Sequence, residues 1–182
     1  MFTFHKSQLR DQPKQFERYI ALCGEWDLLT ALGQFADLSH FLHVDQLAAR
    51  AQQRYAPDKW TVASVVQHII DSERVFSYRA LRIARGDTTP LPGFDQDLFA
   101  AHDNCAANSW ASIAEAFHAT RAATQCLYAS LPPEALFNTA PCSGIEISAG
   151  SLGFVILGHQ LHHMRVLRDL YGIGPAAGKA DF

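Results

Sequence analysis

The sequence has no long hydrophobic run and few charged residues. No segment approaches the roughly 18 consecutive apolar residues of a membrane-spanning helix, and charged residues make up only 18% of the 182. The formal net charge is −3 without any basic run, so a surface that binds nucleic-acid phosphates is not expected. The first residues are too polar for the apolar part of a signal peptide, which favours a cytoplasmic location.

Closely spaced cysteines are also missing. The four cysteines form no C-x-x-C pair, which argues against a zinc ribbon and gives no sign of a disulfide framework; they are Cys23, Cys105, Cys126 and Cys142. We interpret them as small buried hydrophobic residues. Apolar residues still reach 48% of the chain, which is enough for a sizeable core, and the length suits one domain over residues 1–182.

Four long helical segments are predicted, and no convincing strand is. They cover residues 13–35, 61–85, 109–131 and 148–171, each between typical start and stop residues. The connections have room for a short helix within 44–55 and a short hairpin within 132–147. Helices of matched length in a small protein favour an all-α four-helix bundle, and the unequal connections indicate long crossover loops.

The last predicted helix carries three of the nine histidines, in the stretch GHQLHHMRVL. His159 and His163 lie one turn apart in the middle of the stripe that should face the core, while His162 lies on a more polar face. Two imidazoles from successive turns can bind one metal ion at about 2.0–2.1 Å. The alternative is that both are hydrogen-bonded core residues, although two neutral imidazoles facing each other in a core are hard to satisfy.

A catalytic metal usually has three protein ligands, and His68 on the second predicted helix is the best third candidate. It falls where the apolar stripe of that helix meets a more polar wall, a position that suits a residue lining a pocket. Three neutral histidines would leave a metal ion open positions for water or substrate. All-nitrogen ligation suits Zn, Ni, Co and Fe, so the residues alone do not select the metal.

Other polar residues of the predicted helices are weaker candidates. Glu73 falls within the apolar stripe, where an ion pair with an arginine is favoured over support of a ligand histidine. Arg79 and Arg82 can reach the mouth of the cavity and bind an anionic group, but a solvated helix end is the preferred interpretation. Glu115 and His118 form an E-x-x-H motif; a di-iron bundle needs two such motifs and further glutamates, so that site is not expected.

Two stretches together resemble the DinB/YfiT superfamily, in its DinB-like subgroup: KWTVASVVQHIIDSERVFSYRALRIARGDTTPLPGFDQDLF and ISAGSLGFVILGHQLHHMRVLRDLY. The matching residues open the second helix and form the histidine pattern; they are Trp60, Thr61, His68, His159 and His163. The resemblance covers nearly the whole chain. It implies a four-helix bundle of unusual connectivity, often a homodimer. It also implies a divalent metal held by His68, His159 and His163, with Zn or Ni expected before Fe, Co or Mn.

The resemblance implies an activity without choosing the reaction. One possibility is a metal-dependent hydrolase, and another is an S-transferase that uses a low-molecular-weight thiol; either acts on a small molecule, with the loop over residues 92–97 helping to shape the pocket. A second hypothesis is a non-enzymatic bundle that binds a metal or a small molecule, because no Glu or Asp can be placed beside the metal as a general base. A third is a structural or interaction protein with satisfied core histidines.

Overall fold

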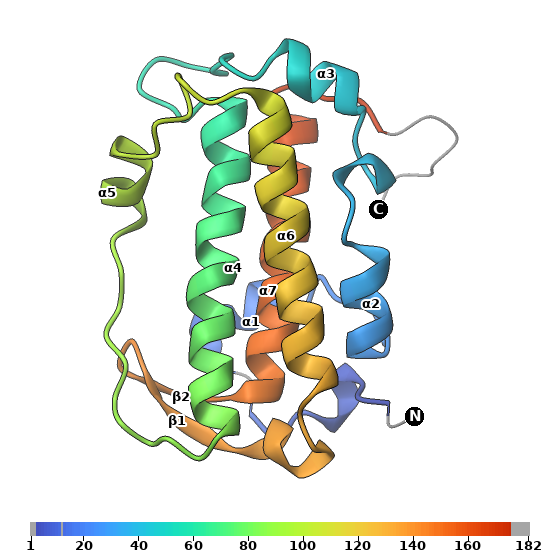
Figure 1. Cartoon of the computed structure of the whole chain (residues 1–182), viewed down its shortest axis with the longest axis vertical. Coiled ribbons are helices and arrows are strands. Elements are labelled where there is room, and N and C mark those ends of the chain that lie inside the picture. The colour runs from blue at the N-terminus through green and yellow to red at the C-terminus, as the bar shows by residue number, and fades with distance from the viewer. Residues whose placement is uncertain (1–2, 12, 176–182) are drawn as a thin grey trace.

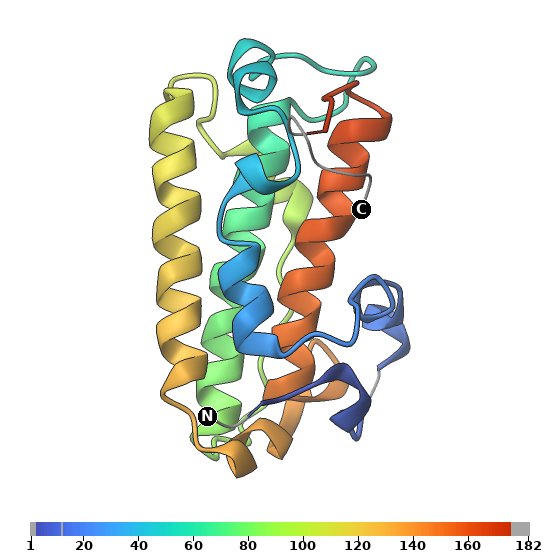
Figure 2. The same cartoon turned by 90° about the vertical axis from the view of Figure 1, so that its right-hand side faces the viewer.

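Three long helices run side by side through the computed structural model, which describes residues 3–11 and 13–175. They are α4 (Val62–Ala84), α6 (Trp110–Ala129) and α7 (Ala149–Asp169). α4 packs against both of the others, and it runs parallel to α6 and antiparallel to α7 (Figures 1 and 2). Two short helices, α1 (Lys14–Ile20) and α2 (Leu28–Gln34), complete the bundle. The predicted all-α four-helix bundle is confirmed.

The continuous helix predicted over residues 13–35 is wrong, because the structure divides it between α1 and α2. Asp27 starts the second helix, since its side chain accepts a hydrogen bond from the backbone N–H of Thr30. The same carboxylate accepts a bond from the backbone N–H of Phe4, which ties the N-terminal segment to the break. The division lets α1 pack on α7 while α2 contacts both α6 and α7.

The other three long helices agree with their predicted ends to within two residues. Each begins at a hydroxyl side chain that accepts a hydrogen bond from a backbone N–H of the first turn; these residues are Thr61, Ser109 and Ser148. The short helix expected in the first connection is α3 (Val44–Ala49), and the expected hairpin consists of β1 (Thr139–Cys142) and β2 (Ile145–Ser148). The remaining short elements are 3₁₀ turns at Lys6–Gln8, Leu38–His40 and Pro133–Phe137.

A long crossover connects α4 to α6, because two parallel helices cannot be joined by a short turn. It travels back along the outside of α4 and contains α5 (Gln96–Ala101) (Figure 1). The crossover is fixed to the hairpin by two backbone hydrogen bonds, from Leu91 to Pro141 and from Ser143 to Leu91. The segment that follows therefore lies beside α4. No helix in the described part of the chain combines the length and apolar character that a membrane crossing needs.

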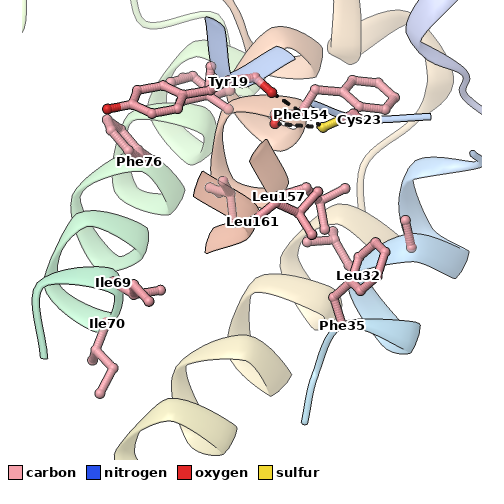
Figure 3. Packing of buried hydrophobic residues seen from close by; sticks show 14 of the residues in the cluster. Tyr19, Cys23, Leu32, Phe35, Ile69, Ile70, Phe76, Phe154, Leu157 and Leu161 are labelled. Atoms are coloured by element: carbon pink, nitrogen blue, oxygen red, sulfur yellow. Dashed lines mark hydrogen bonds between the residues drawn. The ribbon is translucent and has the colours of Figure 1, made fainter. Parts of the chain in front are cut away.

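α1 and α7 approach each other closely within the apolar core (Figure 3). A Cβ atom at Gly158 would lie only 1.9 Å from the carbonyl oxygen of Tyr19, so this contact requires glycine. One turn further along, the Cys23 thiol lies 3.4 Å from the carbonyl oxygen of Phe154. Three of the four cysteines are buried, as interpreted from the sequence, but Cys126 is exposed. The close approach at Gly158 places α1 directly beside the histidines of α7.

Candidate metal centre

Three histidines converge between α4 and α7. His68 projects from α4, while His159 and His163 project from successive turns of α7. Nε2 of His159 lies 3.0 Å from Nε2 of His68 and 3.1 Å from Nε2 of His163. Within the described residues this is the one group of three or more such side chains whose ligand atoms all lie within 4.8 Å of one another. The structure thus brings together the three histidines that the sequence singled out.

Aromatic side chains pack around the histidine rings. The ring of His159 packs edge-on against Tyr19 and Phe76, with ring centroids 5.2 and 6.0 Å apart. The ring of His68 packs against Trp60 at 4.9 Å. His68 is 6% exposed and His159 is 5% exposed. Because these walls remove water from the imidazoles, they disfavour the charged form of each ring.

All three histidines are neutral at physiological pH. Burial lowers the pKa of His68 to about 4, although the negative charge of Asp97 acts in the opposite direction. Burial also holds the pKa of His159 and that of His163 well below 6.5, and the neighbouring imidazoles reinforce the effect. A neutral imidazole has a lone pair to donate, so burial prepares these rings as metal ligands.

The three Nε2 atoms cannot satisfy one another through hydrogen bonds alone. A neutral imidazole nitrogen carries either one hydrogen or one lone pair, yet Nε2 of His159 has two ring nitrogens at hydrogen-bond distance. Ser72 Oγ lies 3.5 Å from Nδ1 of His68, and a hydroxyl can accept from an Nδ1–H, which leaves the lone pair of that tautomer on Nε2, or donate to Nδ1 in the other tautomer. Nitrogens about 3 Å apart suit ligands that lie about 2.0–2.1 Å from one ion. The residues present therefore fit a divalent metal.

Without metal, the protein is expected to lose stability as the pH falls below the usual histidine pKa of 6.5, toward the folded pKa of about 4 for His68. In this range the unfolded chain binds more protons than the folded protein does. The free energy of unfolding should then fall by up to about 1.4 kcal/mol per pH unit for His68 alone. His159 and His163 steepen the slope, because their folded pKa values also lie well below 6.5.

Urea unfolding of the chelator-treated protein between pH 7.5 and 4.5 measures this slope. His68→Asn should reduce it, whereas the same change at His118, which is exposed, should leave most of it. Equal slopes in the parent protein and in His68→Asn would contradict a neutral, buried His68.

Two cavities open onto the histidine cluster. One, of about 240 Å³, has His163, Trp60 and Asp97 among its lining residues. The other, of about 270 Å³, is lined by both His68 and His159 together with Arg79 and several aromatic rings. Residues of the predicted loop over 92–97 contribute to both cavities, which confirms that this loop shapes the pocket.

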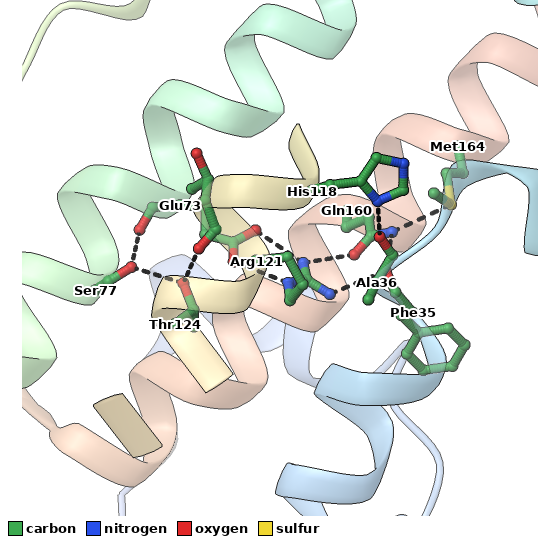
Figure 4. A network of polar contacts seen from close by, with 10 residues as sticks. Phe35, Ala36, Glu73, Ser77, His118, Arg121, Thr124, Gln160 and Met164 are labelled. Carbon is green, nitrogen blue, oxygen red and sulfur yellow. Dashed lines mark hydrogen bonds and ion pairs between the residues drawn. The ribbon is translucent and has the colours of Figure 1, made fainter. Parts of the chain in front are cut away.

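Glu73 forms a structural ion pair, as predicted, and its partner is Arg121. Both side chains are buried, and the two lie 2.8 Å apart in a bidentate pair. Arg121 also donates to Gln160 Oε1 and to the carbonyl oxygen of Phe35 (Figure 4). This network joins α4, α6, α7 and the end of α2, so it connects the helix that bears His68 to the helix that bears the other two histidines.

Arg79 and Arg82 were both predicted to lie in a solvent-exposed helix end. This prediction is wrong for Arg79 and partly right for Arg82. Arg79 is 3% exposed and lies in the cavity beside His68 and His159. Arg82 pairs with Asp87 near the surface. His162, predicted at the margin, is half-buried and packs its ring against Tyr19 at 5.5 Å, outside the convergent group.

The E-x-x-H motif of α6 takes no part in the cluster. Nδ1 of His118 lies 3.0 Å from the carbonyl oxygen of Ala36, and neither His118 nor Glu115 belongs to the metal-type group found in the described residues. Both residues of the motif therefore lie apart from the three convergent histidines.

Sequence reasoning missed Asp97, an acid near the cluster. It lies on α5 in the crossover, lines the same cavity as His163, and its charge acts on His68. No spacing rule connects it to the histidines, because its position depends on how the crossover packs against α4. The two aspartates in GFDQD were the available signal for an acidic residue near the site. The first of them, Asp95, caps α5 instead.

Comparison with known proteins gives one family and one fold relative. A model of the DinB superfamily matches residues 25–167, whereas no curated protein matches the sequence. A similar solved structure is that of YfiT from Bacillus subtilis, described as a probable metal-dependent hydrolase with an unusual four-helix bundle topology. The two chains are 14% identical, with a TM-score of 0.61 over 91% of this chain and 93% of YfiT. At this identity the likeness concerns the fold.

Proposed function

The chain belongs to the DinB superfamily, and on this premise we propose that it is a metal-dependent hydrolase of a small molecule, with His68, His159 and His163 as the metal ligands. The observation that carries the proposal is the convergence of three neutral Nε2 atoms beside two cavities. The description of YfiT as a probable metal-dependent hydrolase supports this reaction class. A divalent ion in such a site supplies Lewis-acid activation of water and of the bond under attack.

Each part of the site has a role that follows from its position. The buried histidines stay unprotonated at neutral pH, so they can hold a cation without first losing protons. The rings of Trp60 and Phe76 cover one side of His68 and of His159 and so restrict the access of bulk water to these imidazoles. We assign proton transfer to Asp97, because it lines the cavity onto which His163 opens.

Zn or Ni is the proposed metal, with Fe, Co and Mn as alternatives. Three neutral nitrogen donors favour the borderline metals over Mg and Ca, which prefer oxygen ligands. The proposed location is the cytoplasm, in keeping with the polar first residues. The proposed assembly is a homodimer, which the family resemblance implies. Thiol S-transfer and non-enzymatic metal binding are the competing functions at the same site.

Elemental analysis followed by turnover assays tests the proposal. Protein purified without an affinity tag should contain near-stoichiometric metal, and the loaded protein should hydrolyse members of a panel of activated esters and amides. Asp97→Asn should keep the metal while losing about 100-fold or more in kcat, the usual contribution of a general base. Asp95→Asn changes a neighbouring acid of the same loop and is the matched control.

The alternatives give different results in the same assays. Conjugation of a model electrophile with a small thiol, without hydrolysis, would replace the hydrolase by a thiol transferase. Stoichiometric metal without either reaction would indicate a binding module. Failure to bind any divalent metal at micromolar concentration would reject the proposed function altogether.

A further inference from the structure

The bundle buries two arginines deeply, and only one has a counter-ion. Arg121 is fully buried and pairs with Glu73. Arg79 is 3% exposed, yet within the described residues no carboxylate lies within 4.0 Å of its guanidinium. A buried cation is costly unless a negative charge accompanies it. The difference between the two arginines points to a negative group that Arg79 receives from outside the chain.

The contacts of Arg79 hold its guanidinium in place without neutralising it. Nη2 donates to the carbonyl oxygen of Pro92 at 2.7 Å and to Ser143 Oγ at 3.0 Å. Both acceptors are neutral, and together they use the two hydrogens of Nη2. A guanidinium has five N–H donors, so the three on Nη1 and Nε have no hydrogen-bond partner in residues 3–11 and 13–175. Nε–H and the Nη1–H groups point to different sides of the guanidinium, because each bidentate pairing of an arginine includes Nη2, whose hydrogens are taken here. Each remaining donor can give a carboxylate oxygen one charge-assisted hydrogen bond.

Arg79 and the histidine cluster belong to the same cavity. Both His68 and His159 line the cavity of about 270 Å³ in which Arg79 lies. Arg79 follows His68 by eleven residues on α4, which is about three turns and about 16 Å along the axis. Long helical side chains lean toward the N-terminus of their helix, which is the direction of His68. The cavity thus has a cation at one end and the proposed metal ligands at the other.

The wall between the two ends is aromatic. The guanidinium of Arg79 lies 5.9 Å from the ring centroid of Phe76 and 5.8 Å from that of Phe94. Phe16 packs edge-on against Phe76 at 5.8 Å, and Tyr19 lines the same cavity. A ligand between Arg79 and the histidines therefore meets an apolar surface along its length.

We propose that Arg79 binds the carboxylate of the substrate, and that the substrate is a small carboxylic acid with an aromatic or apolar body whose reacting end reaches the histidine cluster. Its identity as the substrate rests on the proposed hydrolase function; carboxylate binding by Arg79 does not. In the bound state the carboxylate supplies the missing counter-ion. Pro92 and Ser143 position the guanidinium, so the crossover and the hairpin tip both contribute to specificity.

Binding to the metal-free protein tests this inference separately from catalysis. The probes are phenylacetate, 3-phenylpropionate and 4-phenylbutyrate, each compared with its neutral amide by calorimetric titration after removal of metal. At least one carboxylate should bind about tenfold or more tightly than its amide, since the amide has no negative charge to pair with the guanidinium. Arg79→Gln should abolish this preference. Arg82→Gln, one turn further along α4, should keep it because Arg82 already pairs with Asp87.

The ratio of carboxylate to amide affinity in the unchanged protein is informative even if Arg79→Gln folds poorly. Equal affinity for each pair, or no binding of any carboxylate, would overturn the inference, as would a preference that survives in folded Arg79→Gln. Because the titration uses no metal and no turnover, it can fail while the metal-dependent function holds. It can equally succeed if metal binding fails.

Discussion

His159→Ala is expected to weaken Zn binding by about 100- to 1000-fold. A structural Zn site with four ligands binds with about 10–16 kcal/mol in small domains, or roughly 2.5–4 kcal/mol per ligand, and every 1.4 kcal/mol is tenfold in affinity. His159 is the central ligand of the proposed site, because its Nε2 lies within 3.1 Å of both other Nε2 atoms. Competition with a chromogenic chelator at pH 7.5 measures the change in affinity.

His162→Ala is the matched control for this measurement. It removes an imidazole from the same turn of α7, but one that lies outside the convergent group. Since His159→Ala also removes ring contacts with Tyr19 and Phe76, unfolding of both variants should be compared in the presence of chelator. A folded His159→Ala protein that binds Zn as tightly as the parent would remove these histidines from consideration as ligands.

The arrangement of the histidines was predictable because it depends mainly on helical periodicity. His159 and His163 are four residues apart, so any regular helix places them on one face. His68 required one further assumption, that α4 and α7 pack together, which the four-helix pattern supplied. Metal ligation itself stays a prediction, since proximity of Nε2 atoms is what the structure provides.

The break between α1 and α2 was not predicted, because apolar residues continue at helical spacing through it. Ile20, Cys23, Leu28 and Leu32 are all buried, as one continuous helix would also have required. The local signals were Gly24 and the capping residue Asp27, and neither is decisive alone. The contact that stabilises the break comes from Phe4, which lies 23 residues away in sequence.

The burial of Arg79 could also not be predicted from the sequence. Its position near the end of an amphipathic helix is compatible with solvent exposure. Burial results from the crossover at Pro92 and the hairpin tip at Ser143, which are 13 and 64 residues away. Similarly, the sequence indicated that Glu73 needs an arginine but did not identify Arg121, which is 48 residues away on α6. Buried ion pairs depend on tertiary packing, for which local periodicity carries no signal.

Arg121→Met is expected to lower the free energy of unfolding by about 3–5 kcal/mol, the usual result of leaving one member of a buried ion pair alone. Arg121 is fully buried, and Glu73, at 3% exposed, would keep an uncompensated charge. Gln160 and the carbonyl of Phe35 would each lose a donor as well. Urea unfolding at pH 7.5 in the presence of chelator measures this loss without any contribution from metal.

A double variant separates the ion pair from simple loss of packing. Arg121→Met with Glu73→Leu removes both charges and keeps apolar volume, so it should recover most of the stability lost in either single variant. The pair near the surface provides the comparison: Arg82→Met should cost much less stability than Arg121→Met, because solvent screens the attraction between Arg82 and Asp87. If the double variant is as unstable as the sum of the single variants, packing rather than charge pairing holds α4, α6 and α7 together. Recovery of stability together with unchanged Zn affinity would show that the helices keep the histidines in register even when the polar network is gone.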